Sequence, residues 1–217
     1  MIAVHGALGK LGHLICTEAQ KNNTQVLPLF RNSALSLELT PDLTGVIDVS
    51  SAEGLHNLIQ HMPPRLPLLV GTTGALPWKA LEKHAQTAPV AVVPNFSAGV
   101  PLLLELLSTA IKMLPQGWDI EVIEVHHNQK KDAPSGTAKR IVTAINKAEL
   151  EHKNLTSKIP THSLRVGDTF GEHTVWLCGP GERLEIKHVA TQRSVFATGA
   201  LRWLSWLEKQ SPGLIKP

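Results

Sequence analysis

The chain begins with Met1-Ile2-Ala3-Val4-His5-Gly6-Ala7-Leu8-Gly9-Lys10-Leu11-Gly12, the stretch that decides its fold class. Residues 1–5 form a short apolar run of the kind found in buried strands, and a glycine-rich segment follows at once. Apolar residues then recur at helical spacing over residues 13–21. A strand, a glycine-rich turn and a helix in this order predict the phosphate-binding corner of a dinucleotide-binding fold.

The glycines at 6, 9 and 12 follow the spacing GxxGxxG rather than GxGxxG. Ordinary tight turns use the same residues, so the position of the triplet at the start of a strand-turn-helix pattern carries the interpretation. The segment supplies six candidate cofactor-binding residues: Gly6, Ala7, Leu8, Gly9, Lys10 and Leu11.

Alternation of short apolar runs with helical segments continues to residue 97. The runs at 25–30, 45–49, 66–70 and 90–93 are continuous rather than alternating, as expected of parallel strands covered on both faces. Residues 1–97 are therefore predicted to form an α/β domain with a Rossmann-type, doubly wound parallel sheet.

Open sheets of this kind bind ligands outside the carboxyl ends of their strands. Small residues there let a flat ring lie against the backbone, and the strand ends add six candidates for cofactor contact: Gly71, Thr72, Thr73, Pro94, Asn95 and Phe96. Arg31 and Ser33 follow the second strand, where NAD-preferring folds usually place an acid. Arg31 can meet a 2′-phosphate there, which favours NADPH, or can cap a strand at the surface.

The second half of the chain changes character. Residues 102–114 predict a helix that is apolar nearly all round and hence buried. Residues 120–125 alternate apolar and polar residues and predict a strand. The segments 163–167, 171–178 and 182–188 alternate as well, with Gly and Pro between them. That pattern predicts antiparallel hairpins, and thus an α+β domain with a mixed, largely antiparallel sheet. Residues 195–207 predict a final amphipathic helix.

A strand-to-helix loop stands at the centre of this half: His126-His127-Asn128-Gln129-Lys130-Lys131-Asp132-Ala133-Pro134-Ser135-Gly136-Thr137. It combines imidazole and ammonium groups with the start of a helix, whose N–H groups attract anions. The loop thus predicts an anion site equipped with proton donors. A solvated surface loop is the ordinary alternative. A metal site is not expected, because no Cys, Asp or Glu accompanies the histidines at zinc-ligand spacing.

Composition places further bounds on function. The 217 residues are 42% hydrophobic and 18% charged, with a formal charge of +3, which fits a globular protein and gives no argument for nucleic acid as a partner. Cys16 and Cys178 lie in apolar runs, so a reducing compartment is expected rather than a disulfide framework. The sequence has neither a signal-peptide pattern at its start nor an apolar run of membrane-spanning length. A cytoplasmic protein without a membrane partner is the expectation.

The central loop resembles the HHxxKxDAPSGT signature of the dihydrodipicolinate reductase family, with every fixed position filled. The resemblance extends over almost the whole chain, through GTTG at 71–74, PNFSAGV at 94–100, RVGDTFGEHTVW at 165–176, GERLEIKH at 181–188 and TQRSVFATGAL at 191–201. The chain is shorter than is usual in the family between the second and third strands and between Leu150 and Ser163. The shortened loops are ones expected from the resemblance to help enclose the cofactor or the substrate.

This resemblance implies reduction of 4-hydroxy-tetrahydrodipicolinate to tetrahydrodipicolinate with NADPH or NADH, on the way to diaminopimelate and lysine. His126 is then the proton donor and acceptor, and Lys130 a second donor that also stabilises charge. The dicarboxylate substrate is expected to contact His127, Lys130, Ser135, Gly136 and Thr137.

The resemblance also implies a division of labour. Residues 1–97 and 194–217 would form the dinucleotide-binding domain, and residues 98–193 the substrate-binding domain through which a homotetramer assembles. Two alternatives stay open. Another two-domain NAD(P)-dependent oxidoreductase acting on an anionic substrate would share the first 97 residues but has no need of the loop. A non-catalytic NAD(P) sensor would be expected to lack a complete set of proton donors.

Overall fold

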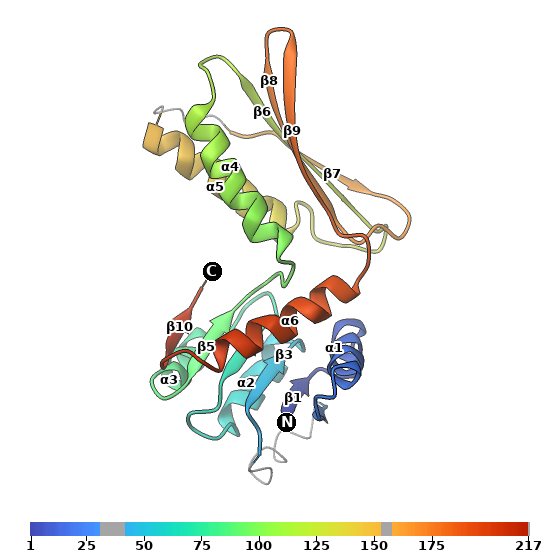
Figure 1. Ribbon diagram of the computed structural model, residues 1–217, viewed down its shortest axis with the longest axis vertical. Helices are drawn as coiled ribbons and strands as arrows, with labels where there is room; N and C mark the ends of the chain where they lie inside the picture. The colour runs from blue at the N-terminus through green and yellow to red at the C-terminus, as the bar shows by residue number, and fades with distance from the viewer. Residues whose placement is uncertain (31–41, 153–157, 217) are drawn as a thin grey trace. The chain divides into compact units, whose positions relative to one another are not determined.

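The computed structural model describes residues 1–30, 42–152 and 158–216 (Figure 1). The chain divides into two compact units. The first unit consists of residues 1–96 and 193–217, and the second of residues 97–192. Arg31 and Ser33, proposed from sequence to favour NADPH, lie outside the described residues.

The first unit is built on a six-stranded parallel sheet in the order β10-β5-β4-β3-β1-β2. Its strands are β1 (Ile2–His5), β2 (Val26–Leu29), β3 (Gly45–Asp48), β4 (Leu68–Val70), β5 (Pro89–Val92) and β10 (Gly213–Ile215). Helices α1 (Lys10–Lys21) and α6 (Ser194–Leu207) share one apolar core with the sheet, and α2 (Ala52–Gln60) and α3 (Trp78–Ala85) share the other. Both faces are covered, which confirms the predicted doubly wound sheet.

The end of the chain completes the first unit. Helix α6 packs against α1 and buries Ala197, Ala200, Leu204 and Leu207. The main chain of α6 comes so close to Phe96 that a Cβ on Gly199 would collide with the Phe96 carbonyl oxygen. Strand β10 then pairs in parallel with β5 at the sheet edge. Strand β10 is only three residues long and was not predicted from the sequence.

The second unit contains a four-stranded sheet in the order β7-β6-β8-β9. Its elements are α4 (Gly99–Met113), β6 (Asp119–His126), α5 (Gly136–His152), β7 (Thr161–Arg165), β8 (Glu172–Gly179) and β9 (Glu182–Val189). β7 runs parallel to β6, to which α5 connects it, so the antiparallel hairpin predicted for residues 163–167 is wrong. The other two pairings are antiparallel, and the sheet is mixed as predicted. Helices α4 and α5 pack together and share the core with one face of this sheet (Figure 1).

Helix α4 is less buried than its sequence predicted. It presents Leu103, Leu107 and Ile111 to the core, whereas Leu102 and Met113 are 60% and 79% exposed. One stripe of α4 is enough to cover the sheet and α5. Apolar side chains outside this stripe, such as Leu102 and Met113, therefore remain exposed. In the described part of the chain, no helix combines the length and apolar character needed to cross a membrane.

Candidate active site

Strand β6 carries two polar side chains in step with its core residues. Residues along a strand alternate between its faces, and here Ile120, Val122, Glu124 and His126 are all buried while their neighbours are not. These four side chains therefore share the face on which α4 and α5 pack. A carboxylate and an imidazole are thus built into the edge of an apolar core.

A row of polar residues crosses the sheet at Glu124. In the strand register Glu124 stands opposite Ser163 of β7 on one side and His173 of β8 on the other. His173 in turn stands opposite His188 of β9. The pairing of four strands thus brings together residues that are up to 64 positions apart in the sequence, since the row runs from Glu124 to His188.

The Glu124 carboxylate is fully buried and is ionised at neutral pH. Its Oε1 atom accepts hydrogen bonds from the backbone N–H of Ser135, at 3.0 Å, and from Nη2 of Arg165, at 2.9 Å. Burial acts to raise the pKa of Glu124, but hydrogen bonds from Ser135, Ser163 and Arg165 outweigh it and lower the pKa to about 2.

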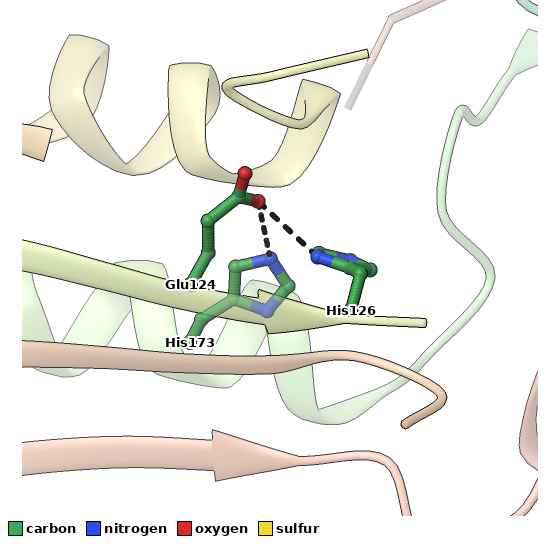
Figure 2. Close-up of side chains that lie close together, drawn as sticks. All are labelled: Glu124, His126 and His173. Atoms are coloured by element: carbon green, nitrogen blue, oxygen red, sulfur yellow. Dashed lines mark ion pairs between the residues drawn. The ribbon is translucent and has the colours of Figure 1, made fainter. Parts of the chain in front are cut away.

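The other carboxylate oxygen faces two imidazoles, as Figure 2 shows. Oε2 of Glu124 lies 3.3 Å from Nδ1 of His126 and 3.9 Å from Nε2 of His173. Burial lowers the pKa of His126, the charge of Glu124 opposes this, and the cations Lys130 and Arg165 reinforce it. Burial and the neighbouring His126 lower the pKa of His173 to about 4, so His173 is neutral at physiological pH.

The imidazoles continue in a line across the sheet. The rings of His126 and His173 meet edge to face with centroids 5.2 Å apart, and His188 lies 6.3 Å beyond His173. Nε2 of His188 is 3.0 Å from the hydroxyl of Ser97. Burial lowers the pKa of His188 as well. His173 thus fixes the plane of the His126 ring from one side.

Lys130 and Asp132 lie in the loop that follows β6. Nζ of Lys130 is 2.7 Å from a carboxylate oxygen of Asp132, and the lysine side chain is 23% exposed. Burial acts to raise the pKa of Asp132, but the bond from Lys130 outweighs it. Arg165 holds this loop by donating to the carbonyl oxygens of Lys130, at 3.3 Å, and Asp132, at 2.6 Å. One guanidinium therefore joins the loop to Glu124.

Ser135 forms the N-cap of α5 rather than an open ligand position. It is 2% exposed, and its hydroxyl accepts from the backbone N–H of Ala138 at 3.1 Å. The same oxygen lies 3.4 Å from Nε2 of His173. Its neighbours differ: Gly136 is exposed with open space about its Cα, and Thr137 is nearly buried. His127 is half-buried.

His126 and Lys130 were predicted from the sequence, whereas Glu124, His173, Arg165 and His188 were not. A signal for two of them is present in the printed sequence. Glu124 falls in phase with Ile120 and Val122 on β6, and His173 falls in phase with Val175 and Leu177 on β8. A titratable residue in step with apolar ones on a strand indicates a buried polar group. Arg165 follows only from the strand register.

The first unit has a cavity at its glycine-rich turn. It measures about 260 Å³ and lies at the carboxyl ends of β1, β2 and β3, where the strand order reverses. Gly6 has a φ of +86°, and a Cβ there would lie 2.7 Å from the Val49 carbonyl oxygen; a Cβ on Gly12 would collide with the Gly6 carbonyl oxygen. These positions tolerate only glycine, and the space beside them fits a nucleotide phosphate. The cavity is lined by His5, Gly6, Ala7, Leu8, Gly9, Leu29, Phe30, Ser50, Ser51 and Gly54.

The remaining predicted cofactor residues divide into two groups. Thr72 and Phe96 are buried: Thr72 donates to Asp48 at 2.5 Å, and the Phe96 ring lies where a Cβ on Gly71 would be. Lys10, Leu11, Thr73, Pro94 and Asn95 are exposed or half-buried. The Asp48 carboxylate also accepts a hydrogen bond from the Ser50 hydroxyl at 2.6 Å and lies 2.7 Å from Nδ1 of His5. These contacts tie together the ends of β1, β3 and β4.

A metal ion is the alternative occupant of the cluster in the second unit. Glu124, His126 and His173 offer three ligand atoms within 4.8 Å of one another, and metal sites use such residues. However, Arg165 already neutralises Glu124, and the charge of Lys130 acts on the same imidazoles. Because Arg165 and Lys130 balance the carboxylates of Glu124 and Asp132, the cluster has no uncompensated negative charge to attract a divalent cation. We therefore interpret the cluster as a site that holds and moves protons.

Comparison with known proteins identifies a family to which the chain is similar along most of its length. The family model described as dihydrodipicolinate reductase, C-terminus, matches residues 99–216. A protein named 4-hydroxy-tetrahydrodipicolinate reductase from Syntrophotalea carbinolica is 34% identical, over 98% of this chain and 95% of that protein. A protein of the same name from Campylobacter jejuni subsp. jejuni is 38% identical, over 96% and 93% of the two chains.

Solved structures agree on the fold. A dipicolinate-bound dihydrodipicolinate reductase from Paenisporosarcina sp. TG-14 superposes with a TM-score of 0.74 at 23% identity, covering 99% of this chain and 96% of the other. An aspartate semialdehyde dehydrogenase from Vibrio cholerae gives a TM-score of 0.54 at 10% identity, covering 95% and 97%. The two-unit α/β architecture is thus shared with enzymes whose names differ.

Proposed function

Because this chain belongs to the dihydrodipicolinate reductase family, we propose that it reduces 4-hydroxy-tetrahydrodipicolinate to tetrahydrodipicolinate with NADPH or NADH. This reaction is a step towards diaminopimelate and lysine. The observation that carries the proposal is the environment of His126: a buried imidazole beside an ionised carboxylate, at the start of the loop that bears Lys130 and leads into α5.

We infer that the second unit binds the substrate. Reduction of a conjugated C=N ring leaves negative charge that a proton must neutralise, and an imidazole can deliver one near neutral pH. His126 is the proposed proton donor and acceptor. Lys130 is the second donor and stabilises charge on the substrate. The carboxylates would contact His127, Lys130, Gly136 and Thr137, with the start of α5 contributing its partial positive charge. Ser135, also expected from the sequence to contact the substrate, would instead hold the start of α5 in place as its N-cap.

We infer that the first unit binds the nucleotide. The turn at Gly6–Gly9 and its cavity would hold the diphosphate, which leaves Gly71–Thr73 and Pro94–Phe96 for the nicotinamide end. When bound, the reduced nucleotide supplies the hydride. NADPH is expected to serve at least as well as NADH. That expectation rests on the sequence at Arg31, and Arg31→Ala should then weaken NADPH selectively.

The test is an assay of the purified protein with substrate generated in situ by the preceding synthase, following the oxidation of NADPH and of NADH. We expect oxidation that depends on substrate. His126→Gln should lower kcat and flatten its pH profile near neutrality, and Lys130→Ala should also lower turnover. Thr137→Val should instead raise KM by roughly ten- to a hundredfold, the effect of one lost charge-assisted hydrogen bond.

Absence of substrate-dependent oxidation with either nucleotide would rule out this function. A His126→Gln enzyme with the wild-type rate and pH profile would keep the function but move the proton donor to Lys130 or water. The homotetramer implied by the family resemblance stays a prediction, which sedimentation of the purified protein would check.

A further inference from the structure

We propose that Glu124 is a positioning residue, whose carboxylate holds His126 in the tautomer that carries its proton on Nδ1 and so presents Nε2 to the substrate. The kinetic consequence of this proposal rests on the proposed function. The tautomer itself does not, because it depends only on groups within the second unit.

We infer that Nδ1 of His126 pairs with Oε2 of Glu124 because both atoms are buried and, in the described part of the chain, have no other hydrogen-bond partner. Nδ1 of His126 and Oε2 of Glu124 are 3.3 Å apart, and their side chains are 11% and 0% exposed. Within residues 1–30, 42–152 and 158–216, neither atom has a hydrogen-bond partner. An ionised carboxylate only accepts, so the proton must lie on Nδ1 for the two atoms to attract each other. In a neutral imidazole, Nε2 then keeps the lone pair.

Glu124 is held in place for this task. Its other oxygen is fixed by the Ser135 N–H and by Arg165, which come from the start of α5 and from β7. These bonds prevent the carboxylate from turning away, and they hold its pKa far enough below neutrality that it stays an acceptor. Arg165 also donates to the carbonyls of Lys130 and Asp132, so the same contacts link the carboxylate to the loop that bears Lys130.

The opposite edge of the His126 ring faces a glycine. Gly171 has a φ of +142°, and a Cβ built there would lie 3.1 Å from Nε2 of His126 and 3.4 Å from Cδ2. The absence of a side chain at Gly171 leaves space beside Nε2. His173 meanwhile packs edge to face on the ring at 5.2 Å and restrains its rotation. The carboxylate, the packed ring and the glycine thus orient the imidazole from three sides.

The charges around His126 decide how the loss of Glu124 would act. Glu124 and Asp132 favour the imidazolium form, whereas Lys130 and Arg165 disfavour it. Neutralising Glu124 would leave the cations less opposed and lower the pKa of His126 further. The titratable and charged groups that face it are Glu124 on β6, Lys130 and Asp132 in the loop, Arg165 on β7 and His173 on β8, with His188 on β9 beyond.

The decisive variant is Glu124→Gln. Its amide oxygen can still accept from Ser135 and Arg165, while its amide N–H groups face Nδ1 and favour the reversed tautomer. We expect kcat to fall roughly 10- to 100-fold with KM little changed, as for partial loss of general acid catalysis. The high-pH limb of the profile should move down by about one unit, because an opposite charge has been removed. Glu121→Gln, which removes a carboxylate paired with His162 on the same strand, is the matched control and should behave as wild type.

Nitrogen-15 NMR of histidine-labelled protein without substrate provides a second measurement. We expect the Nδ1–H tautomer for His126 in the wild type and the Nε2–H tautomer in Glu124→Gln. A wild-type His126 protonated on Nε2 would overturn the proposal, as would a Glu124→Gln enzyme with unchanged kcat and pH profile. If the wild type shows no reductase activity, the proposed function is wrong. The tautomer of His126 then still tests whether Nδ1 donates to Glu124. If Glu124→Gln does not fold, the wild-type spectrum decides alone.

Discussion

His173 shows how the site couples to the stability of the second unit. The side chain is 3% exposed, and burial lowers its pKa from 6.5 to about 4. In the unfolded chain the imidazole titrates at its ordinary value. Between these two pH values the unfolded state therefore binds a proton that the folded state does not, and stability decreases as the pH falls.

We accordingly predict that His173 alone makes the second unit roughly 3 kcal/mol less stable as the pH falls from about 6.5 to about 4. His126 and His188, whose pKa values are also lowered by burial, act in the same direction. Glu124 acts at lower pH: its pKa falls from 4.5 to about 2 on folding, so its contribution is lost as the pH drops through that range. Urea denaturation across these pH values measures the slope. His173→Phe should make the dependence between about pH 6.5 and 4 less steep. His162→Gln, a change at an exposed histidine of the same unit, should keep it. An unchanged slope in His173→Phe would mean that another group titrates there.

At the scale of elements, the segment from β1 through the glycine-rich turn into α1 is sharply constrained. Gly12 lies in the first turn of α1, where a Cβ would meet the carbonyl oxygen of Gly6. That contact is with backbone, which cannot move aside as a flexible side chain would. Close packing of the helix on the turn therefore depends on a missing methyl group.

Gly12→Ala is predicted to push α1 away from the turn and deform the cavity beside Gly6. Overpacking of this kind costs about 1 to 3 kcal/mol, and if the whole cost falls on binding, NADPH affinity drops roughly ten- to a hundredfold. Fluorescence titration of the protein with the reduced nucleotide measures this affinity. His13→Ala changes an exposed neighbour on the same helix and is the control. Equal affinity for Gly12→Ala and wild type would place the diphosphate elsewhere.

The elements also show what sequence periodicity can and cannot predict. It predicted the strands and helices of both units because burial imposes a repeat of two or 3.6 residues. It overestimated the burial of α4, since a helix that is apolar all round gives no sign of which stripe meets the core, and it missed β10. The loop at residues 126–137 was singled out as a candidate site through family resemblance, whereas Glu124 and His173 were not identified. Their meeting depends on the register between β6 and β8, which no local pattern encodes.

The whole molecule consists of two units of which the first is discontinuous in sequence. The chain leaves the first unit after Phe96 and returns at Arg193, so α6 and β10 belong to a core begun almost 200 residues earlier. Leu204 illustrates this dependence. It is 2% exposed, and a Cβ on Gly45 of β3 would lie 2.7 Å from its Cδ1 atom.

We predict that the two units unfold as separate cooperative units and that Leu204→Ala destabilises only the first. Truncating a buried leucine costs about 2 to 5 kcal/mol, through lost burial and the cavity that remains. Amide hydrogen exchange shows which strands are destabilised. Exchange should accelerate in β1 and β3, whose side chains share the core of Leu204, and stay unchanged in β6 and β8.

Trp206→Ala is the matched control for Leu204→Ala, because Trp206 lies on the same helix but is 43% exposed. It removes a larger side chain without opening a cavity, so exchange in β1 and β3 should change far less. Equal acceleration of β1, β3, β6 and β8 in Leu204→Ala would show that the chain unfolds as one cooperative unit. In that case the acid sensitivity of His173 and Glu124 would destabilise the six-stranded parallel sheet as well, and the two effects could no longer be assigned to separate units.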